Sequence, residues 1–235
     1  MLDFTPWNTL LQTYVDDRGR VDYARWQQSD SAALDAWLGS LPNSLDGLTA
    51  EESLALLINL YNGLTIQQVL KQYPIDSILP KLLGVPNWFS FWRFFSRSLY
   101  QLNGKPTSLN GIEHGTLRPR FKEPRIHFAL VCASGGCPIL RNEAYWPDIV
   151  EAQLETDAHR FIHNPEKVRY DAEAGVLYCS QIFKWYGEDF LRVAASVPDY
   201  IGSYLAPTPP LSALTKVEYL PYDWGLNQQP AGGKG

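Results

Sequence analysis

One long apolar segment in the first half of the chain constrains the fold more than any other. Residues 54–69 contain no charged side chain, and they follow Thr49–Glu52, a sequence typical of a capped helix start. These residues are expected to form a buried helix. Asn59 and Asn62 interrupt it, and a buried amide needs hydrogen-bond partners. The simpler interpretation is that each amide bonds neighbouring backbone, and the alternative is that they belong to a site.

The remaining patterns predict helices first and hairpins later. We expect helices within residues 1–85, a hairpin from 96–102 and 106–109, a short helix over 110–117, a strand over 126–132, helices over 144–163 and 182–193, a hairpin from 168–171 and 176–180, and a strand over 216–224. This order predicts an α+β fold in which an N-terminal helical layer packs on a small, mainly antiparallel sheet. We expect one globular domain over residues 1–227 and a disordered tail over 228–235.

Charge and composition exclude several classes of protein. The formal net charge is −5, and the basic residues are scattered, so the electrostatic footprint of a nucleic-acid binder is missing. The N-terminus lacks the basic and apolar regions of a signal peptide, and no apolar run approaches the roughly 18 residues that span a bilayer. Three cysteines without a short-range framework favour a reducing compartment. We therefore expect a soluble, cytoplasmic protein with no nucleic-acid partner and no membrane span.

Reactive side chains are concentrated between residues 113 and 137. Two of the three cysteines and two of the four histidines lie there. The predicted strand ends at Cys132, and a turn of small residues over 133–136 leads to Cys137 and Pro138. Proline is favoured in the first turn of a helix, which places Cys137 near a helix N-terminus, where the pKa of a thiol is lowered. This concentration predicts a cysteine-based site.

A nucleophilic cysteine needs an imidazole and a group that orients the imidazole. The candidates are Cys132 or Cys137, His114 or His127, and Glu113, Asn62 or Asp223. Adjacent residues on a helix point about 100° apart, so Glu113 is poorly placed to orient the ring of His114. The competing interpretation is structural, because a cysteine that ends an apolar strand is more often part of the core. These residues alone leave the nucleophile open.

Zinc binding by the same residues is the nearest chemical alternative. The ligand set would be Cys132, Cys137, His114 and His127. The usual paired spacing on the second side is missing, and His159 and His163 lie on a separate helix without the glutamate of a metalloprotease motif. The two cysteines also lack the two-residue spacing of thioredoxin-like motifs. We therefore expect no metal and no cofactor.

Five segments resemble the domain-of-unknown-function 547 family. They are I-N-L-Y-N-G-L-T-I (58–66), I-E-H-G-T-L-R (112–118), R-I-H-F-A-L-V-C-A-S-G-G-C-P-I-L-R (125–141), S-Q-I-F-K-W-Y-G-E-D-F (180–190) and L-P-Y-D-W-G-L-N (220–227). The resemblance covers roughly residues 22–227. It implies a globular domain that occurs alone in bacteria and is attached to other domains in plants, and it implies no particular activity.

The family pattern also ranks the candidate residues. Glu113, His114, Cys132 and Asn62 match it most broadly, whereas plant-type members carry serine at the position of Cys137 and vary at that of His127. The resemblance therefore implies Cys132 as the nucleophile, against the argument from the helix terminus. The set is similar to papain-like and transglutaminase-like enzymes in residue types only.

Two functions from different classes follow. In the first, a cysteine hydrolase or acyltransferase uses Cys132 to attack an acyl carbon and His114 to move the proton, with Glu113 or Asn62 orienting. Backbone N–H groups over 133–136 would form the oxyanion hole. Its substrate would be a small molecule or a peptide, held between aromatic segments over 88–95, 185–186 and 222–224. In the second, a non-catalytic interaction or ligand-binding module contains a structural Glu-His-Cys cluster and binds a protein partner.

The secondary candidates have expected roles under the first function. Cys137 would be an inert thiol that caps the following helix. His127 lies five residues before Cys132, about 16 Å along a regular strand. That distance would exclude His127 as the base for Cys132.

Overall fold

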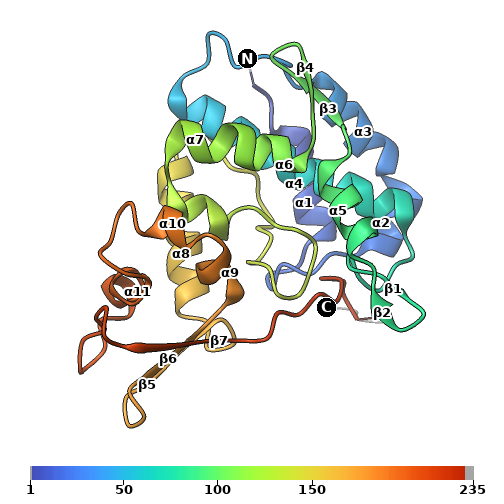
Figure 1. The fold of residues 1–235 in the computed structure, drawn as a ribbon. Helices are drawn as coiled ribbons and strands as arrows, with labels where there is room; N and C mark the ends of the chain where they lie inside the picture. Colours follow the sequence, from blue (N-terminus) through green and yellow to red (C-terminus); the bar gives the residue numbers. More distant parts are fainter. Residues whose placement is uncertain (1, 231–235) are drawn as a thin grey trace.

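The chain is mainly helical, with two short hairpins in its first half and a three-stranded sheet in its second half. The structure, a computed structural model, describes residues 2–230. Its α-helices are α1 (Thr5–Tyr14), α2 (Tyr23–Ser29), α3 (Ser31–Ser40), α4 (Ala50–Gln72), α5 (Trp88–Ser96), α6 (Leu109–Ile112), α7 (Arg118–Phe121), α8 (Val150–Ile162), α9 (Gln181–Trp185), α10 (Gly187–Phe190) and α11 (Val197–Leu205) (Figure 1). A π-helix (Glu113–Leu117) joins α6 to α7, and a 3-10 helix spans Pro124–Phe128. The strands are β1 (Lys81–Leu82), β2 (Val85–Pro86), β3 (Tyr100–Leu102), β4 (Lys105–Thr107), β5 (Val168–Asp171), β6 (Val176–Cys179) and β7 (Lys216–Tyr219). The α+β class is confirmed.

Helix α4 is the centre of the larger hydrophobic core. Thr49 caps it with a reciprocal capping box that includes Glu52, as the sequence predicts. The helix is buried at every position from Ser53 to Ile66, because its composition offers no polar face to solvent. Helices α2, α3, α6 and α8 all contact it. Among the described residues, no helix is both long and apolar enough to cross a membrane.

Both buried amides of α4 are bonded to backbone. Asn59 donates to the carbonyl of Tyr145 and accepts from its N–H, at 2.8 and 3.0 Å. Asn62 bonds the segment before Cys132 in the same way: it donates to the Ala129 carbonyl and accepts from the Val131 N–H, each at 3.0 Å. Each amide thus offers one donor and one acceptor to a backbone segment, as a neighbouring β-strand would.

The apolar run over 126–132 is not a strand, so this prediction is wrong. Its first part belongs to the 3-10 helix that begins at Pro124, and Ala129 to Cys132 are irregular and largely buried. A short apolar run without periodicity does not distinguish a strand from another buried segment. Here Asn62 and helix-type bonds such as Ala129 N–H to the Ile126 carbonyl satisfy the backbone, so no sheet is needed.

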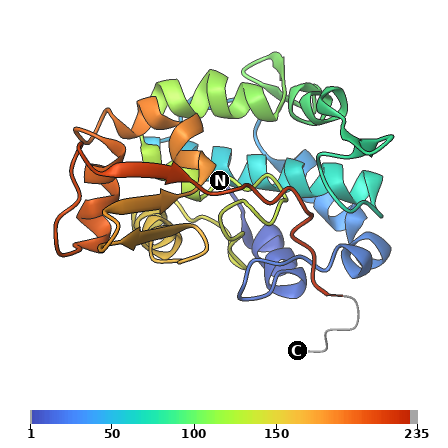
Figure 2. The same cartoon turned by 60° about the horizontal axis from the view of Figure 1, so that its bottom comes forward.

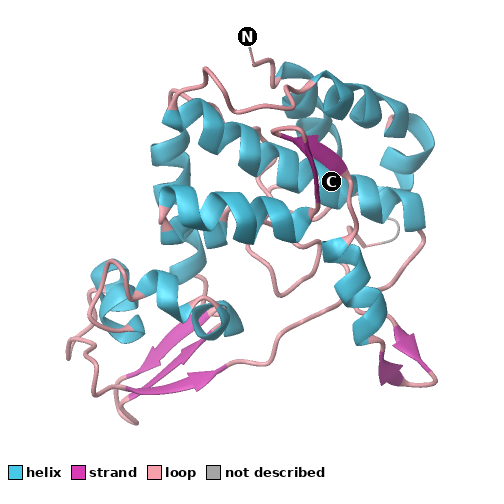
Figure 3. Cartoon of the chain, turned by 45° about the horizontal axis from the view of Figure 1, so that its top comes forward, coloured by secondary structure: helices cyan, strands magenta, loops and turns pink. Residues whose placement is uncertain are grey.

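The two predicted hairpins are confirmed. Strands β3 and β4 pair around Asn103 and Gly104, which both have the positive φ angles of a tight hairpin turn. Strands β5 and β6 pair antiparallel, and β7 adds to β6 in parallel. The β3–β4 hairpin bonds to the loop after α3, whereas the three-stranded sheet packs with α8 to α11 in a second hydrophobic cluster (Figure 3).

Three helix predictions need correction. The helix expected over 144–163 begins only at Val150, because Gln153 and Asn59 hold the chain over 144–146 in an irregular path. The helix expected over 182–193 is divided at Tyr186 and ends at Phe190. No helix follows Cys137 directly, so Cys137 is not a helix cap.

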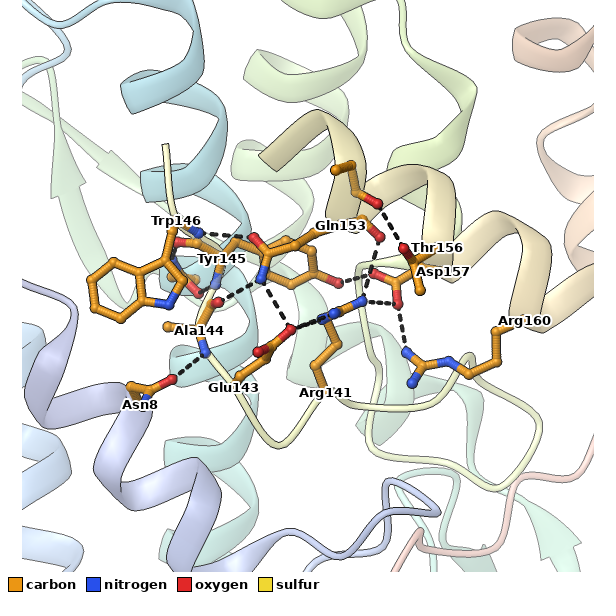
Figure 4. Close-up of polar contacts among 12 residues, drawn as sticks. Asn8, Arg141, Glu143, Ala144, Tyr145, Trp146, Gln153, Thr156, Asp157 and Arg160 are labelled. Atoms are coloured by element: carbon orange, nitrogen blue, oxygen red, sulfur yellow. Dashed lines mark hydrogen bonds and ion pairs between the residues drawn. The ribbon is translucent and has the colours of Figure 1, made fainter. Parts of the chain in front are cut away.

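A polar network holds the irregular segment after Cys137. Arg141 bonds Glu143 and the carboxylate of Asp157 on α8, at 2.7 Å for Asp157 (Figure 4). The Tyr145 hydroxyl donates to the other oxygen of Asp157 at 2.6 Å. Gln153 reaches the backbone of Ala144 and Trp146. The network fixes residues 141–146 against α8 without regular structure.

The segment after β7 returns across the molecule. It runs from the sheet past the cysteine turn to the N-terminal helices (Figure 2). The Gln229 N–H donates to the Val21 carbonyl at 3.0 Å, and the Val21 N–H donates to the Asn227 carbonyl at 2.9 Å. Gln228 accepts from the Tyr73 hydroxyl at 3.3 Å. Gln228 and Gln229 belong to the predicted tail, and residues 231–235 of that tail lie outside the described residues.

Candidate active site

A pocket of about 440 Å³ opens between α5, the π-helix and α9. Its polar lining residues are Asn110, Glu113, His114, Arg118 and Cys132, and its aromatic lining residues are Tyr61, Trp88, Phe91, Trp92, Phe95, Trp185, Tyr186 and Trp224. The structure therefore brings three of the four predicted catalytic residues to one cavity. All three predicted aromatic segments also contribute to its walls.

Asn62, the fourth predicted catalytic residue, does not line the pocket. Both polar atoms of its side chain are bonded to the backbone of Ala129 and Val131. It thus positions the chain that ends at Cys132, and it is buried away from the pocket.

Cys132 and Cys137 are joined by a disulfide. The sequence analysis expected free thiols, so this expectation is corrected. The two cysteines are five positions apart, and the turn over 133–136 brings their sulfurs together. A thioredoxin-like motif has two residues between its cysteines, whereas four lie between these. Cys132 is half-buried and faces the pocket, whereas Cys137 is buried. Cys179 is free and buried, and burial raises the pKa of its thiol to about 12.

Two hydroxyl groups surround the sulfur of Cys132. The Ser134 hydroxyl lies 3.2 Å from it and the Tyr222 hydroxyl 3.4 Å. Burial raises the pKa of Tyr222, so its phenol stays protonated and can donate to sulfur. Tyr222 is also 3.3 Å from the sulfur of Cys137. These donors would stabilise a thiolate on Cys132 once the disulfide is reduced.

Two of the backbone donors predicted for an oxyanion hole, in the turn over 133–136, already have acceptors. The Gly135 N–H donates to the Gly225 carbonyl at 2.8 Å, and the Gly136 N–H donates to the Asp223 carbonyl at 2.7 Å. A Cβ on Gly136 would lie 2.8 Å from that same carbonyl oxygen. The glycines therefore allow the C-terminal segment to approach, and their donors are already used.

His114 meets Arg118 across one turn of the π-helix. Its Nδ1 lies 2.9 Å from a terminal nitrogen of Arg118. A guanidinium can only donate, so Nδ1 accepts and Nε2 carries the proton in the neutral ring. In the neutral ring this contact leaves the N–H donor on Nε2, and the role of His114 as the proton carrier stays a prediction.

Glu113 is buried beside two phenols. It lies next to Tyr61 and Tyr186, and burial followed by the nearby carboxylate raises the pKa of both. The π-helix allows Glu113 and His114 to line the same pocket although they are consecutive residues. The Glu113 carboxylate thus lines the cavity with two protonated phenols beside it.

His127 lies beneath the pocket. Its Nε2 is 2.8 Å from Oδ2 of Asp189, its Nδ1 is 4.0 Å from Glu113, and its ring stacks on Tyr186 at 3.8 Å. Arg118 donates to the same Asp189 oxygen at 2.6 Å. Both ring nitrogens of His127 therefore face carboxylates, those of Asp189 and Glu113, under the floor of the site. Its exclusion as the base for Cys132 stays a prediction.

Burial and neighbouring charges shift the pKa values of His127 and Asp189 in opposite directions. Burial lowers the pKa of His127 more than the neighbouring carboxylates raise it. Burial alone would raise the pKa of Asp189, but the hydrogen bonds from His127 and Arg118 hold it well below its usual range. Asp189 therefore stays ionised, and it fixes Arg118 beneath His114.

Arg118, Asp189 and Tyr61 were not predicted as site residues, and Tyr186 was predicted only as part of an aromatic wall. A usable signal existed for each, because all four lie inside the motifs quoted above. Arg118 follows His114 by four residues, and Tyr186 and Asp189 are three residues apart, spacings that place side chains together on a helix. Tyr61 precedes Asn62 on the buried helix. Arg118, Asp189 and Tyr61 carry neither a thiol nor an imidazole, and the sequence pattern alone gave them no role.

The described residues contain no group of three or more His, Cys, Asp or Glu side chains placed to hold a metal ion. His159 and His163 stack on each other at 3.8 Å on the exposed face of α8. His114 and His127 serve different partners, as described above.

The fold and the pocket define a small α+β protein with a cysteine in an aromatic cavity. The family model described as "Protein of unknown function, DUF547" matches residues 45–162, just over half of the 235-residue chain, so the protein belongs to the DUF547 family. No curated protein and no solved structure matches the chain. The matched region contains Glu113, His114 and Cys132, and it ends before the aromatic walls from Trp185 and Trp224.

Proposed function

We propose that the protein is a cysteine-dependent hydrolase or acyltransferase that acts when its disulfide is reduced. The observation that carries the proposal is that Cys132, Glu113 and His114 line one aromatic cavity of about 440 Å³. Cys132 is also the half-buried member of the cysteine pair, whereas Cys137 is buried behind it. A small molecule or a peptide side chain fits a cavity of this size and lining.

The steps follow from the contacts of each group. The sulfur of reduced Cys132 attacks the acyl carbon, and its proton passes to the Glu113 carboxylate. The Nε2–H of His114 donates to the acyl oxygen, which replaces the donors that Gly135 and Gly136 do not offer. Glu113 then gives the proton to the leaving group. Water or an acceptor alcohol or amine resolves the thioester and restores the thiol.

Thiol labelling tests the nucleophile. Without a reductant, we expect iodoacetamide to label none of the three cysteines quickly, because two are paired and Cys179 is buried. After reduction, Cys132 should react fast below pH 8, since hydroxyl donors favour its thiolate. Mass spectrometry identifies the labelled residue. Equally slow labelling of Cys132 and Cys137 in the reduced protein would count against the proposal.

A panel of acyl esters and thioesters tests turnover under reducing conditions. Cys132→Ser and Glu113→Gln should each lower kcat/KM at least about a hundredfold, whereas Cys137→Ser, which equally removes the disulfide, should stay near wild type. This matched pair separates loss of the nucleophile from loss of the disulfide. If Cys137→Ser abolishes turnover and Cys132→Ser does not, the nucleophile is Cys137.

The second candidate is a ligand-binding module with no turnover. It is favoured by the disulfide, because the oxidised pocket contains no free thiol. Melting temperatures of the reduced proteins decide between the two. If Cys132→Ser and His114→Ala unfold the protein, the cluster is structural, and if they only remove turnover, the pocket is catalytic.

A further inference from the structure

An apolar surface protrudes from the molecule beside the pocket. The β1–β2 hairpin carries Leu82, Leu83 and Val85, whose exposed fractions are 63%, 97% and 65%. The hairpin projects away from the helical body below α5 (Figure 3). Single exposed leucines are ordinary, but three exposed apolar side chains within four residues at the end of a projecting hairpin are not.

Leu83 stabilises neither the turn nor the core. Its φ is +52°, a left-handed conformation that glycine and asparagine adopt more easily. Its side chain is almost fully in water, so packing does not compensate. The companion hairpin β3–β4 uses Asn103 and Gly104 at the equivalent turn, which shows the ordinary solution in the same chain.

The first turns of α5 extend this surface. Trp88, Phe89 and Trp92 are 57%, 70% and 63% exposed, while Phe94 and Phe95 on the same helix face the core. The Asn87 N–H donates to the Pro80 carbonyl at 2.8 Å and ties the helix start to the base of the hairpin. The apolar tip is defined by these six side chains: Leu82, Leu83, Val85, Trp88, Phe89 and Trp92.

The segment of chain that carries the apolar tip has a charge opposite to that of the whole chain. Residues 77–112 contain Lys81, Arg93, Arg97 and Lys105 and no aspartate or glutamate, although the formal net charge of the chain is −5. All four basic residues are exposed. Within residues 2–230, none of them forms a salt bridge. Their charge is therefore free to attract an anionic surface.

We infer that the apolar tip docks on an anionic lipid bilayer. Leu82 and Leu83 enter the boundary between headgroups and acyl chains, and Trp88 and Trp92 lie at the level of the headgroups, where tryptophan is enriched. Lys81, Arg93 and Arg97 contact the anionic headgroups. Protruding apolar side chains with a basic surround suit a deformable, negatively charged layer better than a rigid protein groove.

The apolar tip and the pocket share two residues. Trp88 and Trp92 belong to both, so a docked molecule would place the pocket entrance next to the lipid. That consequence rests on the proposed function: acyl groups held in the bilayer would be the substrates. Docking itself does not depend on turnover, and it is measured without substrate.

Vesicle co-sedimentation tests the docking. The full chain should sediment with vesicles of phosphatidylcholine and phosphatidylglycerol, less with pure phosphatidylcholine, and less at high salt. Leu82→Ser combined with Leu83→Ser should weaken binding by at least roughly tenfold, since two leucines no longer leave water. Lys81→Glu should weaken it further in anionic vesicles only.

Leu214→Ser is the matched control, because Leu214 is 95% exposed on the loop before β7. It should bind like the wild type, and all variants should keep the wild-type melting temperature, since the changed side chains are in water. The inference would be overturned if the wild type did not bind anionic vesicles. It would also be overturned if Leu214→Ser weakened vesicle binding as much as the leucine double variant does. If the wild type instead forms dimers without lipid and the leucine variant is monomeric, the surface binds a second copy. Neither result would bear on the thiol chemistry.

Discussion

Single buried side chains determine how the polar floor of the pocket responds to pH. Burial lowers the pKa of His127 below its usual value of roughly 6.5, so the unfolded chain takes up a proton at a pH where the folded protein does not. Acidification through that range therefore favours unfolding. Asp189 acts in the same direction at lower pH, because its pKa is held below its usual value and its contribution is lost only when it is protonated.

We predict that His127→Gln removes one part of the pH dependence of stability. The wild-type free energy of unfolding should fall as the pH decreases just below roughly 6.5, and the variant should lack this slope even if it is less stable overall. Urea unfolding at a series of pH values measures both. His163→Gln is the control, because His163 is exposed on α8 and should leave the slope unchanged. Retention of the slope in His127→Gln would refute the assignment.

For single residues, the sequence indicates which residue types form the site, but it does not indicate all of their roles. Glu113, His114 and Cys132 could be chosen from the motifs, and they do share a cavity. The disulfide could not be chosen, because it depends on the path of the turn over 133–136. Nor could the donor role of His114, which depends on Arg118 approaching one ring nitrogen.

Among the elements, the contact between α3 and α4 depends on one glycine. A Cβ on Gly63 would lie 2.7 Å from the ring of Trp37. That ring cannot shift easily, because it stacks on Trp7 at 4.9 Å. The buried glycine thus sets how closely the two helices approach, although glycine is unfavourable inside a helix.

We predict opposite effects for two Gly→Ala substitutions in these helices. Gly63→Ala should destabilise the protein by about 1–3 kcal/mol, since overpacking outweighs the gain in helix propensity. Gly39→Ala on α3 meets nothing within 4 Å, so it should be neutral or stabilise by up to about 1 kcal/mol. Chemical denaturation of both variants measures the difference. Stabilisation by Gly63→Ala would show that the helices can separate at no cost.

Elements were predictable where local chemistry determines them. The capping box of α4 and the Asn103–Gly104 turn carry their own signals, and both form as expected. The run over 126–132 carries only hydrophobicity, and its conformation is decided by Asn62, a residue 67 positions from its partner Ala129. The strand prediction for residues 126–132 failed because the side chain of Asn62, distant in sequence, supplies the hydrogen bonds that a neighbouring strand would supply.

On the scale of the whole molecule, Asn227 connects the two ends of the described chain to the cysteine turn. Its side chain accepts from the Tyr23 hydroxyl at 2.7 Å and donates to the Gly19 carbonyl at 3.3 Å. Its N–H donates to the Ala133 carbonyl at 3.1 Å. One residue thus links the first helices to the segment that carries both reactive cysteines.

We predict that Asn227→Ala lowers the free energy of unfolding by about 1–3 kcal/mol, because it leaves the buried end of Tyr23 without its acceptor. It should also speed iodoacetamide labelling of Cys137 in the reduced protein, since the turn is less firmly held. Ser203→Ala, which removes only a hydrogen bond within α11, serves as the control and should change neither quantity. Unchanged stability of Asn227→Ala would mean that backbone pairing alone holds the ends.

The path of the C-terminal segment has a consequence for the order of assembly. Ser134 and Tyr222 are separated by 88 positions, and the carbonyls that occupy the Gly135 and Gly136 donors come from Asp223 and Gly225. During synthesis the turn therefore leaves the ribosome long before the residues that complete it. Until residues 222–225 follow, the two thiols lie in a turn that lacks its hydrogen-bond partners, and this later segment also completes the wall of the pocket through Trp224.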